Sequence, residues 1–592
     1  MTFQAWLTSL LLLLVVGLML WGRVRLDVLG LSVPVALVLL GLAAPGEVFR
    51  GFANPAVLAL VFIFMVTRGL ERTGATDALA RRLTRWARGS ERRTLAVVTG
   101  VTALLSLTMN TVAAAAVVVS PALALARRLR MAPSRLLLPV AYAALLGGMA
   151  TLLTTANLIA DAALRQAGYP GFTLFSFLPV GIPAALVGLA FLWWAAPHLL
   201  PAHPQQARDA RDPHRPLETY RLVHGLHALR VLPGSPLVGR SARRPHLART
   251  LGLTPLGRLR DGQFQPIFLL EGERIQAGDV LIVAGEPETP VLRDLGMEWL
   301  PQQTWLEGYL QEVPWMEIAV HPHGHAAGCT PQQLRLRERY GALVVALWRG
   351  GRAYHHALYN FPLEHGDALL VQGPPEGLEA LSQDPDFLPL TPPPRRRHRR
   401  RMLLALGWWA LVLVLAGAFH LPLAWAALFG VVGMAWTGLL PMEEAYRAVE
   451  WRSIFLIAGF LPLGEALLKT GVAHALIQVL LPEGTLWPLP ALLALLVALA
   501  SLLAQVLSGQ VSALLLVPLA LALAEQQGYP PRLLAMAVAV GASLAFLLPT
   551  GHPANLLVLG PGGYTPRDYL RLGIPLTVVV FPVLVLALWA MG

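Results

Sequence analysis

The sequence predicts an all-α polytopic membrane protein with an α+β insertion in its middle. Of its 592 residues, 55% are hydrophobic and 14% are charged, and the mean hydropathy is +0.58. A soluble domain has about 25% charged residues, so this composition indicates a chain that lies largely in lipid. Hydrophobic runs fill residues 1–200 and 402–592, whereas residues 201–401 have a soluble composition and contain 12 of the 16 histidines.

Ten hydrophobic runs come near the roughly 20 residues that a membrane-spanning helix requires. Five spans in each half, joined by a linker on one side of the membrane, give two halves of opposite orientation. This is the inverted repeat of many secondary transporters. The predicted spans lie near 5–21, 28–44, 55–70, 136–158 and 174–197, and near 402–418, 422–440, 453–468, 532–558 and 573–591.

Basic residues lie mainly beside the predicted spans and set their orientation. The net charge is +12, and of the 46 basic residues only Lys469 is a lysine. The basic run 395–401 directly precedes a span, so the positive-inside rule places it and the soluble block in the cytoplasm. Residues 72–93 are then also cytoplasmic, and both termini and residues 472–486 lie outside. The charge therefore indicates an inner-membrane topology and not a nucleic-acid partner.

Two hydrophobic runs are too long for one straight span and carry polar residues in their middle. Residues 94–126 are flanked by arginines on both sides, whereas residues 487–524 lie in a stretch without any basic residue, between Lys469 and Arg532. We therefore expect two re-entrant helical hairpins that enter from the cytoplasm and from outside, respectively. Non-helical backbone in a membrane requires protein or water around it, so both tips are expected to line a cavity.

The soluble block contains its own repeat, with a period of 88–89 residues. Residues 278–285 read Gly-Asp-Val-Leu-Ile-Val-Ala-Gly, and residues 366–373 read Gly-Asp-Ala-Leu-Leu-Val-Gln-Gly. Short apolar runs between Gly and Pro indicate strands, and residues 241–251 and 331–340 are each expected to form a helix. The chain is thus divided into membrane halves 1–200 and 402–592 and small α+β modules 201–306 and 307–401.

Four clusters of small polar residues lie within the membrane halves, at 108–111, 151–157, 508–512 and 550–555. Neutral oxygens suit a hard cation such as Na⁺, and the N-termini of broken helices suit an anion. For any single residue the alternative is hydrogen bonding between helices. We predict a midplane pocket with Asn110, Thr111, Thr155 and Asn157 on one side and Ser508, Gln510, Thr550, His552 and Asn555 on the other. The candidate Na⁺ ligands are Thr108, Asn110, Gly148, Thr151, Ser508 and Gly551.

Three further features have alternative interpretations. Asp161 and Glu465 are the main intramembrane candidates for proton coupling, but each lies near a span end and can be interfacial. His552 can face an anion, take up a proton or be structural. The histidines at 321–325 occupy a turn that lacks them in the other module, which argues against a metal site. The single Cys329 excludes an intrachain disulfide, and no phosphate-binding loop or nucleophile elbow supports an ATPase or an enzyme.

Several motifs resemble a known transporter family. Residues 51–57 read Gly-Phe-Ala-Asn-Pro-Ala-Val, residues 69–74 read Gly-Leu-Glu-Arg-Thr-Gly, and residues 135–139 read Arg-Leu-Leu-Leu-Pro. The most specific motif is 549–558, Pro-Thr-Gly-His-Pro-Ala-Asn-Leu-Leu-Val. Together they resemble the divalent anion–sodium symporter family of the ion-transporter superfamily. The two soluble modules resemble the C-terminal domain of regulator-of-potassium-conductance proteins.

The resemblance implies a homodimer with a scaffold domain and a moving transport domain, as in an elevator. It implies uptake of sulfate, thiosulfate, or di- or tricarboxylates, usually with Na⁺, at Ser-Asn-Thr hairpin tips. The first tip reads Met109-Asn110-Thr111, but the second reads Ser508-Gly509-Gln510 and lacks the Asn, so H⁺ remains an alternative coupling ion. The soluble modules are expected to bind a small cytoplasmic ligand and regulate transport. The rival functions are a potassium transporter or channel, for which no filter motif is present, and a membrane-tethered sensor.

Overall fold

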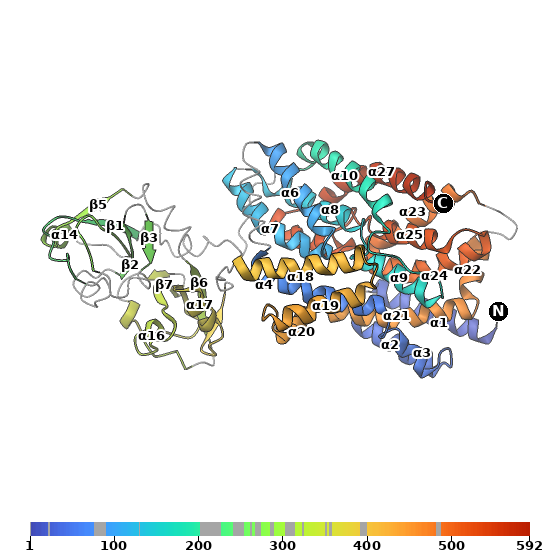
Figure 1. Ribbon diagram of the computed structural model, residues 1–592, viewed down its shortest axis with the longest axis horizontal. Coiled ribbons are helices and arrows are strands. Elements are labelled where there is room, and N and C mark those ends of the chain that lie inside the picture. The colour runs from blue at the N-terminus through green and yellow to red at the C-terminus, as the bar shows by residue number, and fades with distance from the viewer. Residues whose placement is uncertain are drawn as a thin grey trace. The chain divides into compact units, whose positions relative to one another are not determined.

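The computed structural model divides into two compact units (Figure 1). One unit comprises Met1–Arg208 and His398–Gly592, and the other comprises Asp209–Arg397. The first is built of helices and the second of two antiparallel sheets with short helices. The structure describes residues 2–21, 24–75, 90–129, 131–201, 226–240, 254–260, 263–266, 274–284, 289–301, 314–321, 325–349, 352–354, 358–390, 399–480 and 487–592.

The helices of the first half of the chain follow the predicted runs with one difference. The predicted span 136–158 is two helices, because the chain leaves the helix at residues 149–154. The helices are α1 Phe3–Trp21, α2 Leu26–Leu39, α3 Pro45–Arg50, α4 Pro55–Arg72, α6 Glu91–Ser106, α7 Thr111–Arg128, α8 Leu137–Gly148, α9 Thr155–Gln166 and α10 Leu178–Leu199, with a 3₁₀ turn at Pro133–Arg135.

The second half repeats this order, including the break. The predicted span 532–558 is interrupted between residues 543 and 552, where only a 3₁₀ turn, Pro549–Gly551, is present. The helices are α18 Arg399–Gly417, α19 Leu423–Trp436, α20 Met442–Ala448, α21 Trp451–Lys469, α22 Val472–Leu480, α23 Leu489–Leu507, α24 Gly509–Gln527, α25 Pro531–Ala542, α26 Pro553–Gly562 and α27 Pro566–Trp589.

Eight helices within the described residues are long and apolar enough to cross a membrane. They include α23 and α24, the two successive helices at the place of the second predicted hairpin, whereas α2, α19 and α25 are shorter apolar helices of 14, 14 and 12 residues. The ten predicted spans therefore do not correspond to ten long helices, because several of them are short helices or helices interrupted in the middle.

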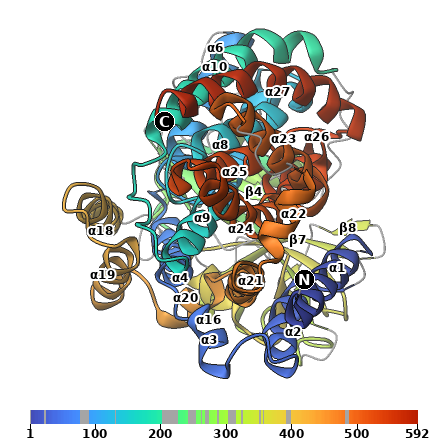
Figure 2. The ribbon, with the colours of Figure 1, turned by 90° about the vertical axis from the view of Figure 1, so that its right-hand side faces the viewer.

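The helices associate in two groups, and each group takes elements from both halves of the chain. In one group α2 packs on α21, and α4 packs on α19 and α20. In the other, α6 packs on α8, α25 packs on α23, α24 and α9, and α10 lies beside α27 (Figure 2). We call these the α2/α21 group and the hairpin group. Contacts of α21 and α22 with α24, and of α4 with α9, join them.

Two ion pairs within the α2/α21 group are related by the repeat. Short α3 presents Glu47 to Lys469 at the end of α21, with 3.0 Å between the Oε1 and Nζ atoms. Short α20 presents Glu444 to Arg72 at the end of α4, with 3.4 Å between Oε1 and Nε. Thr-Gly follows both basic residues, and Gly74 and Gly471 both adopt a positive φ, of 73° and 75°. In each half of the chain, a short helix thus holds the C-terminal end of a long helix of the other half through an ion pair.

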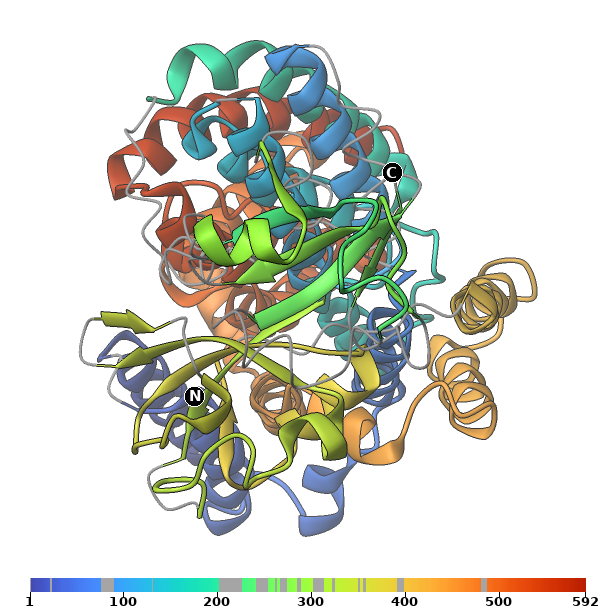
Figure 3. The same cartoon turned by 90° about the vertical axis from the view of Figure 1, so that its left-hand side faces the viewer.

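The second unit contains two five-stranded antiparallel sheets with the same strand order (Figure 3). The orders are β3-β2-β4-β1-β5 and, in the equivalent strands, β8-β7-β9-β6-β10. The expected helix at 331–340 is only α16, Leu336–Tyr340, and the expected helix at 241–251 lies outside the described residues. The strands are β1 Leu226–Val231, β2 Thr254–Arg260, β3 Gln263–Pro266, β4 Val280–Ala284, β5 Met297–Leu300, β6 Trp315–Val320, β7 Leu343–Arg349, β8 Arg352–Tyr354, β9 Ala368–Gln372 and β10 Phe387–Pro389, with helices α14 Thr289–Asp294 and α17 Pro375–Ser382.

The two sheets pack against each other through a shared apolar cluster. Ala228 and Ile282 of the first sheet and Ala346 and Leu370 of the second are all buried in it. The side-chain amide of Gln372 also donates a hydrogen bond to the Leu256 carbonyl across the interface, at 3.4 Å. The sequence repeat therefore folds into a pair of sheets that cover each other within one chain.

Each module holds its β-turn with the same buried ion pair, and this predicts a local stability effect. Arg260 donates two hydrogen bonds of 2.7 Å to the Asp279 carboxylate, which also accepts the Gln276 N–H. Burial by itself would raise the pKa of Asp279, but these bonds outweigh it and lower the pKa below its ordinary value. Asp279→Asn should therefore lower the local free energy of unfolding by about 3 kcal/mol, measured by hydrogen exchange in β4 of the full chain.

The pH dependence of this effect has a defined sign. Because the folded-state pKa of Asp279 is lowered, the stabilisation is present above its unfolded value of 3.8 and is lost as the pH falls further. As a control, Glu298→Gln removes the exposed pair with Arg230 and should change the free energy by less than about 1 kcal/mol. Equal effects of the two substitutions would contradict the prediction.

Candidate functional site

The first pair of hairpin helices, α6 and α7, meets at residues 107–110. Asn110 caps α7, because its side-chain oxygen accepts the Val112 N–H at 2.8 Å. Asn110 and Thr111 are both buried. The position of the turn fits the sequence, since Asn is a preferred N-cap and competes with the helix backbone for hydrogen bonds.

The second pair, α23 and α24, turns at a single residue. Ser508 has φ 80° and ψ 154°, a backbone conformation that is otherwise used almost only by glycine. The helix ends at Leu507 and begins again at Gly509, and the Ser508 side chain does not cap the first backbone N–H groups of α24. The two hairpins therefore have different turns although they occupy equivalent places in the repeat.

The two interrupted helices lie against the hairpins and are held open by equivalent asparagines. The side-chain amide of Asn157 donates to the carbonyls of Thr151 and Met149, at 2.7 and 3.3 Å. That of Asn555 donates to the carbonyls of Ala545 and Leu548, also at 2.7 and 3.3 Å. Both side chains are fully buried. Each asparagine thus supplies hydrogen bonds to carbonyls that the broken helix leaves without helical partners.

Hydroxyl groups tie each break to a hairpin in the same way. Thr151 donates to the Leu107 carbonyl at 3.2 Å, and Thr550 donates to the Gln505 carbonyl at 3.3 Å. Close packing accompanies these bonds: a Cβ atom on Gly147 would lie 2.2 Å from the Ala103 carbonyl oxygen, and one on Gly541 would lie 2.7 Å from that of Val497. Only glycine permits each half-helix to approach its hairpin so closely.

Gln505 is a buried residue of this arrangement that the sequence analysis did not select. Its amide donates to the carbonyls of Leu544 and Ser501, at 2.8 and 3.0 Å, and its oxygen accepts the Leu547 N–H at 2.9 Å. It therefore holds the second break from the hairpin side. A glutamine in the middle of an apolar run was the available signal, but the sequence does not show which backbone groups it meets.

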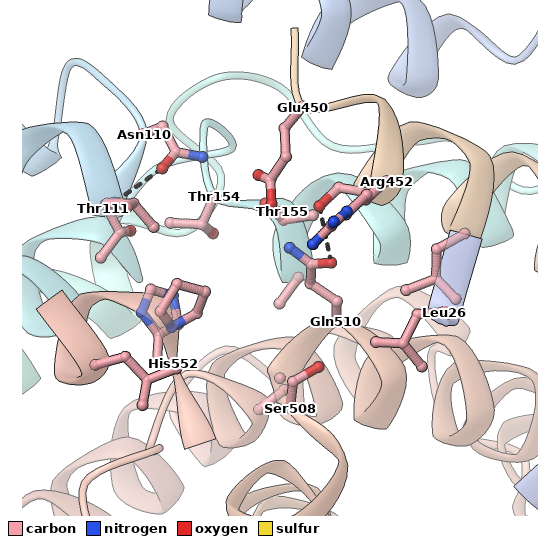
Figure 4. A pocket seen from close by; sticks show the side chains of 18 of the residues that line it. Leu26, Asn110, Thr111, Thr154, Thr155, Glu450, Arg452, Ser508, Gln510 and His552 are labelled. Atoms are coloured by element: carbon pink, nitrogen blue, oxygen red, sulfur yellow. Dashed lines mark hydrogen bonds between the residues drawn. The ribbon is translucent and has the colours of Figure 1, made fainter. Parts of the chain in front are cut away.

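A cavity of about 290 Å³ lies where the hairpin tips and the breaks converge (Figure 4). In this view Thr111 and His552 face each other across one part of it, and Thr155, Gln510 and Ser508 surround another. Asn157 and Asn555 do not line the cavity but lie behind it as the clamps described above. The predicted residues that line it are Asn110, Thr111, Thr155, Ser508, Gln510, Thr550 and His552.

Four helices of the hairpin group begin at this cavity: α7, α9, α24 and α26. Their N-terminal partial positive charges lie at the cavity wall, although the first N–H groups of α26 are already bonded to His552 and the Val112 N–H of α7 is bonded to Asn110. His552 caps α26, since its Nδ1 accepts the Ala554 N–H at 3.1 Å, which leaves Nε2 as the hydrogen-bond donor of a neutral ring. The cavity therefore combines several donors without a full charge from the hairpin group.

Four charged residues at the cavity were not selected from the sequence. They are Arg25 and Asp27 before and in α2, and Glu450 and Arg452 at the start of α21. Arg25 and Asp27 form a two-pronged pair at 3.1 and 2.6 Å. All four belong to the α2/α21 group, so the cavity wall is shared between the two helix groups.

Comparison with known proteins identifies the family of this arrangement. A model of citrate transporters (CitMHS) matches residues 16–510 and 483–592. The chain belongs to the citrate transporter family. It is 32% identical over 597 residues to the uncharacterized transporter YfbS of Escherichia coli, covering 98% of each chain. The uncharacterized transporter sll0640 of Synechocystis is 31% identical, over 94% of this chain and 92% of that protein.

More distant members of the comparison carry a named substrate or a solved structure. Sodium/sulfate cotransporter 1 of Chlamydomonas reinhardtii is 26% identical over 55% of this chain and 38% of its own length. The YdaH transporter of Alcanivorax borkumensis has a crystal structure that is 15% identical with a TM-score of 0.42, over 92% of this chain and 86% of that chain. The prediction of a multi-pass membrane permease is confirmed by the family and by the apolar helices.

The remaining candidate ligands of this citrate transporter family member lie outside the cavity wall. Thr108 hydrogen-bonds the Leu105 carbonyl within its own turn, at 3.0 Å. Gly148 packs beside the hydroxyls of Thr111 and Ser106, and Gly551 beside the side-chain oxygen of Gln505. Each lies close to the hairpin that its half contributes, but behind the residues that face the cavity.

The two candidate proton carriers are engaged in ion pairs away from the cavity. Asp161 accepts Arg165 at 2.8 Å and the Phe172 N–H, and so holds the loop after α9. Glu465 pairs with Lys469 at 2.7 Å and accepts the Gln166 amide at 2.9 Å. Asp161 lies in the middle of α9, whereas Glu465 lies in the last turns of α21. Of the histidine-rich turn, residues 322–324 lie outside the described residues.

The turn of the second hairpin leads to a testable prediction about stability. Ser508→Gly should raise the free energy of unfolding by about 1 kcal/mol, because it removes the strain of a positive φ at a non-glycine residue. Ser508→Ala keeps that strain and removes only the hydroxyl. Thermal unfolding of the purified protein in detergent distinguishes them. A gain in stability for the alanine variant that equals the gain for glycine would contradict the prediction.

Proposed function

We propose that this protein is a secondary active symporter of small divalent anions, such as sulfate or a di- or tricarboxylate, driven by Na⁺. The observation that carries the proposal is the convergence of four helix N-termini and several hydroxyl and amide groups on one cavity. Sulfate and a small dicarboxylate both accept hydrogen bonds at two ends, which suits donors on opposite walls. The relatives named as sodium/sulfate cotransporters support the same class of substrate.

Buried oxygens support a cation beside the anion. Within the described residues, the side-chain oxygens of Asn157 and Asn555 and the Thr154 hydroxyl are buried without a hydrogen-bond partner. An unpaired buried oxygen costs free energy unless a donor or a cation meets it. Neutral amide and hydroxyl oxygens are ligands that a hard cation accepts. Na⁺ at each asparagine would also lower the cost of bringing a dianion into the membrane. H⁺ is the alternative coupling ion.

Transport in this proposal is of the elevator type. The hairpin group holds the tips and breaks, whereas the α2/α21 group supplies one wall and is fastened internally by its two ion pairs. Movement of the hairpin group past α4, α21 and α22 would carry the cavity from one side of the membrane to the other. We also propose a homodimer, as the resemblance implies, with the sheet unit binding a small ligand and adjusting the transport rate.

Sidedness follows from the basic residues and gives a labelling prediction. Residues 72–93 and 201–401 face the cytoplasm in this proposal, so the ends of α1 and α20 and the rim of the cavity do as well. Leu480→Cys and Ala210→Cys, each in a Cys329→Ser background, should react with an impermeant maleimide from opposite sides of the membrane. Unsubstituted Cys329→Ser protein is the control. Labelling of both positions from one side would contradict the inverted repeat.

The function itself is tested by uptake into proteoliposomes. Labelled sulfate, succinate and citrate are offered in parallel with an inward Na⁺ gradient, an inward H⁺ gradient or neither. We expect uptake of at least one dianion that depends on the Na⁺ gradient. Uptake with the H⁺ gradient alone would assign the coupling ion differently, and K⁺ flux without any anion uptake would favour the potassium transporter. Empty liposomes give the background.

A further inference from the structure

The first turn of α21 is a separate wall of the cavity. Glu450, Arg452 and Ser453 line it, together with Arg25 and Asp27 at the start of α2. The two helices cross at a pair of glycines, since a Cβ atom on Gly459 would lie 1.7 Å from the Gly30 carbonyl oxygen. Because glycine has no side chain, the two backbones pack directly against each other at this crossing. The charged ends of α2 and α21 are therefore held close together.

The charges on this wall are unequally paired. Arg25 is matched by Asp27 through two short hydrogen bonds. Arg452, by contrast, forms no ion pair with any carboxylate of the described residues, although the charges of Glu450 and Arg452 interact. In Figure 4 Arg452 reaches from α21 toward Gln510, and Glu450 projects beside Thr155. One hydrogen bond of 3.3 Å, from Ser453 to the Gln510 side-chain oxygen, joins this wall to the second hairpin.

We propose that Arg452 is a charge-selecting residue: it contacts the anion in the cytoplasm-facing cavity, and Glu450 is the counterion that the substrate displaces. This inference rests on the proposed function, since it assumes that the cavity takes an anion. The chemical class that it selects is a substrate with two negative charges, because one charge meets the helix termini of the hairpin group and the other meets the guanidinium.

The hairpin group and the α2/α21 group offer an anion different kinds of positive charge. A helix N-terminus presents roughly half an elementary charge, whereas a guanidinium presents a full one with planar donors that match a carboxylate or sulfate. The helix termini travel with the hairpin group, but Arg452 stays with α21. Its attraction therefore acts only while the cavity lies beside α21. A contact that exists in one of two states gives the substrate a higher affinity for that state.

Glu450 provides a second test of the inference, because removing its charge should change the substrate affinity in the direction opposite to removing the charge of Arg452. In the empty cavity its carboxylate offsets the charge of Arg452 and repels an incoming anion. Glu450→Gln should therefore tighten substrate binding, while Arg452→Gln weakens it. A purely structural role for this turn cannot give opposite signs, since any damage to the turn would weaken transport in both variants.

The experiment measures the Michaelis constants of sulfate and succinate uptake in inside-out and right-side-out vesicles. In inside-out vesicles Arg452→Gln should raise the constant about fivefold and Glu450→Gln should lower it about twofold, with both effects reduced by added salt. In right-side-out vesicles both should stay within about twofold of wild type. Arg447→Gln, an exposed arginine on α20 outside the cavity, is the matched control and should leave the constants unchanged.

A competition assay tests whether the cavity prefers substrates with two negative charges. In wild type, succinate should compete with the labelled anion better than its monomethyl ester, and Arg452→Gln should reduce this preference. Unchanged constants and an unchanged preference, or changes of the same sign in both variants, overturn the inference. The double variant Arg452→Gln/Glu450→Gln should lie between the two single variants. Absence of any anion uptake in wild type overturns the proposed function itself.

Discussion

Asn157→Ala should reduce anion uptake by at least about 100-fold without removing any side chain from the cavity wall. The substitution leaves the carbonyls of Met149 and Thr151 without their donor, and each buried unpaired carbonyl costs about 1–3 kcal/mol. The break between α8 and α9 would close or collapse, and the N-terminus of α9 would no longer point into the cavity. Asn555→Ala should have the same effect on α26.

Uptake and stability together test this prediction. The amount of folded protein is measured by size exclusion and uptake is expressed per folded molecule. Gln527→Ala is the matched control, because Gln527 is also a buried amide that accepts a backbone hydrogen bond, from Trp487 at 3.1 Å, but lies away from the cavity. It should lose stability and keep its uptake per molecule. Normal uptake in both asparagine variants would show that transport needs neither the clamped breaks nor the buried asparagine oxygens.

His552→Asp should abolish transport, whereas His552→Asn should retain most of it. Aspartate and asparagine both accept the Ala554 N–H and cap α26, so neither should unfold the protein. Only aspartate adds a negative charge to an anion cavity. At about 4 Å and an effective dielectric constant near 20, each pair of like charges costs roughly 4 kcal/mol, which is more than 100-fold in affinity.

The same pair of variants separates two roles of the histidine. If the ring is only a cap, His552→Asn transports like wild type at every concentration of anion. If Nε2 also donates to the substrate, the asparagine variant has a raised Michaelis constant with an unchanged maximal rate. Transport by His552→Asp at the wild-type rate would mean that the cavity does not hold an anion, and would contradict the proposed function.

The sequence was informative wherever one residue type has one strong preference. Arginines on both sides of 94–126, and none around 487–524, indicated two different hairpins, and helices α6–α7 and α23–α24 lie there. The repeat in the soluble block corresponds to two sheets of identical strand order. Seven of the nine predicted pocket residues line the cavity, because polar residues in apolar runs collect where helices are interrupted.

Other features depended on geometry that composition does not contain. Hydropathy averages over a window, so an apolar stretch such as 136–158 reads as one span even though its backbone leaves the helix. Asn157 and Asn555 were expected on the cavity wall, but a one-residue motif does not show which way a side chain turns. Arg452 and Glu450 were not selected, since a charge at a span end gives the same signal whether it anchors the helix or faces a substrate.

Lys469 closes one of the two symmetric ion pairs, and it is also the only lysine of the chain. An amine-reactive dye therefore has a single side-chain target in the whole molecule, half exposed and held between Glu47 and Glu465. Because a protonated ammonium does not react, the labelling rate reports how long α3 stays fastened to α21. Without engineered residues, the natural chain thus contains a single lysine whose labelling follows the C-terminal end of α21 during turnover.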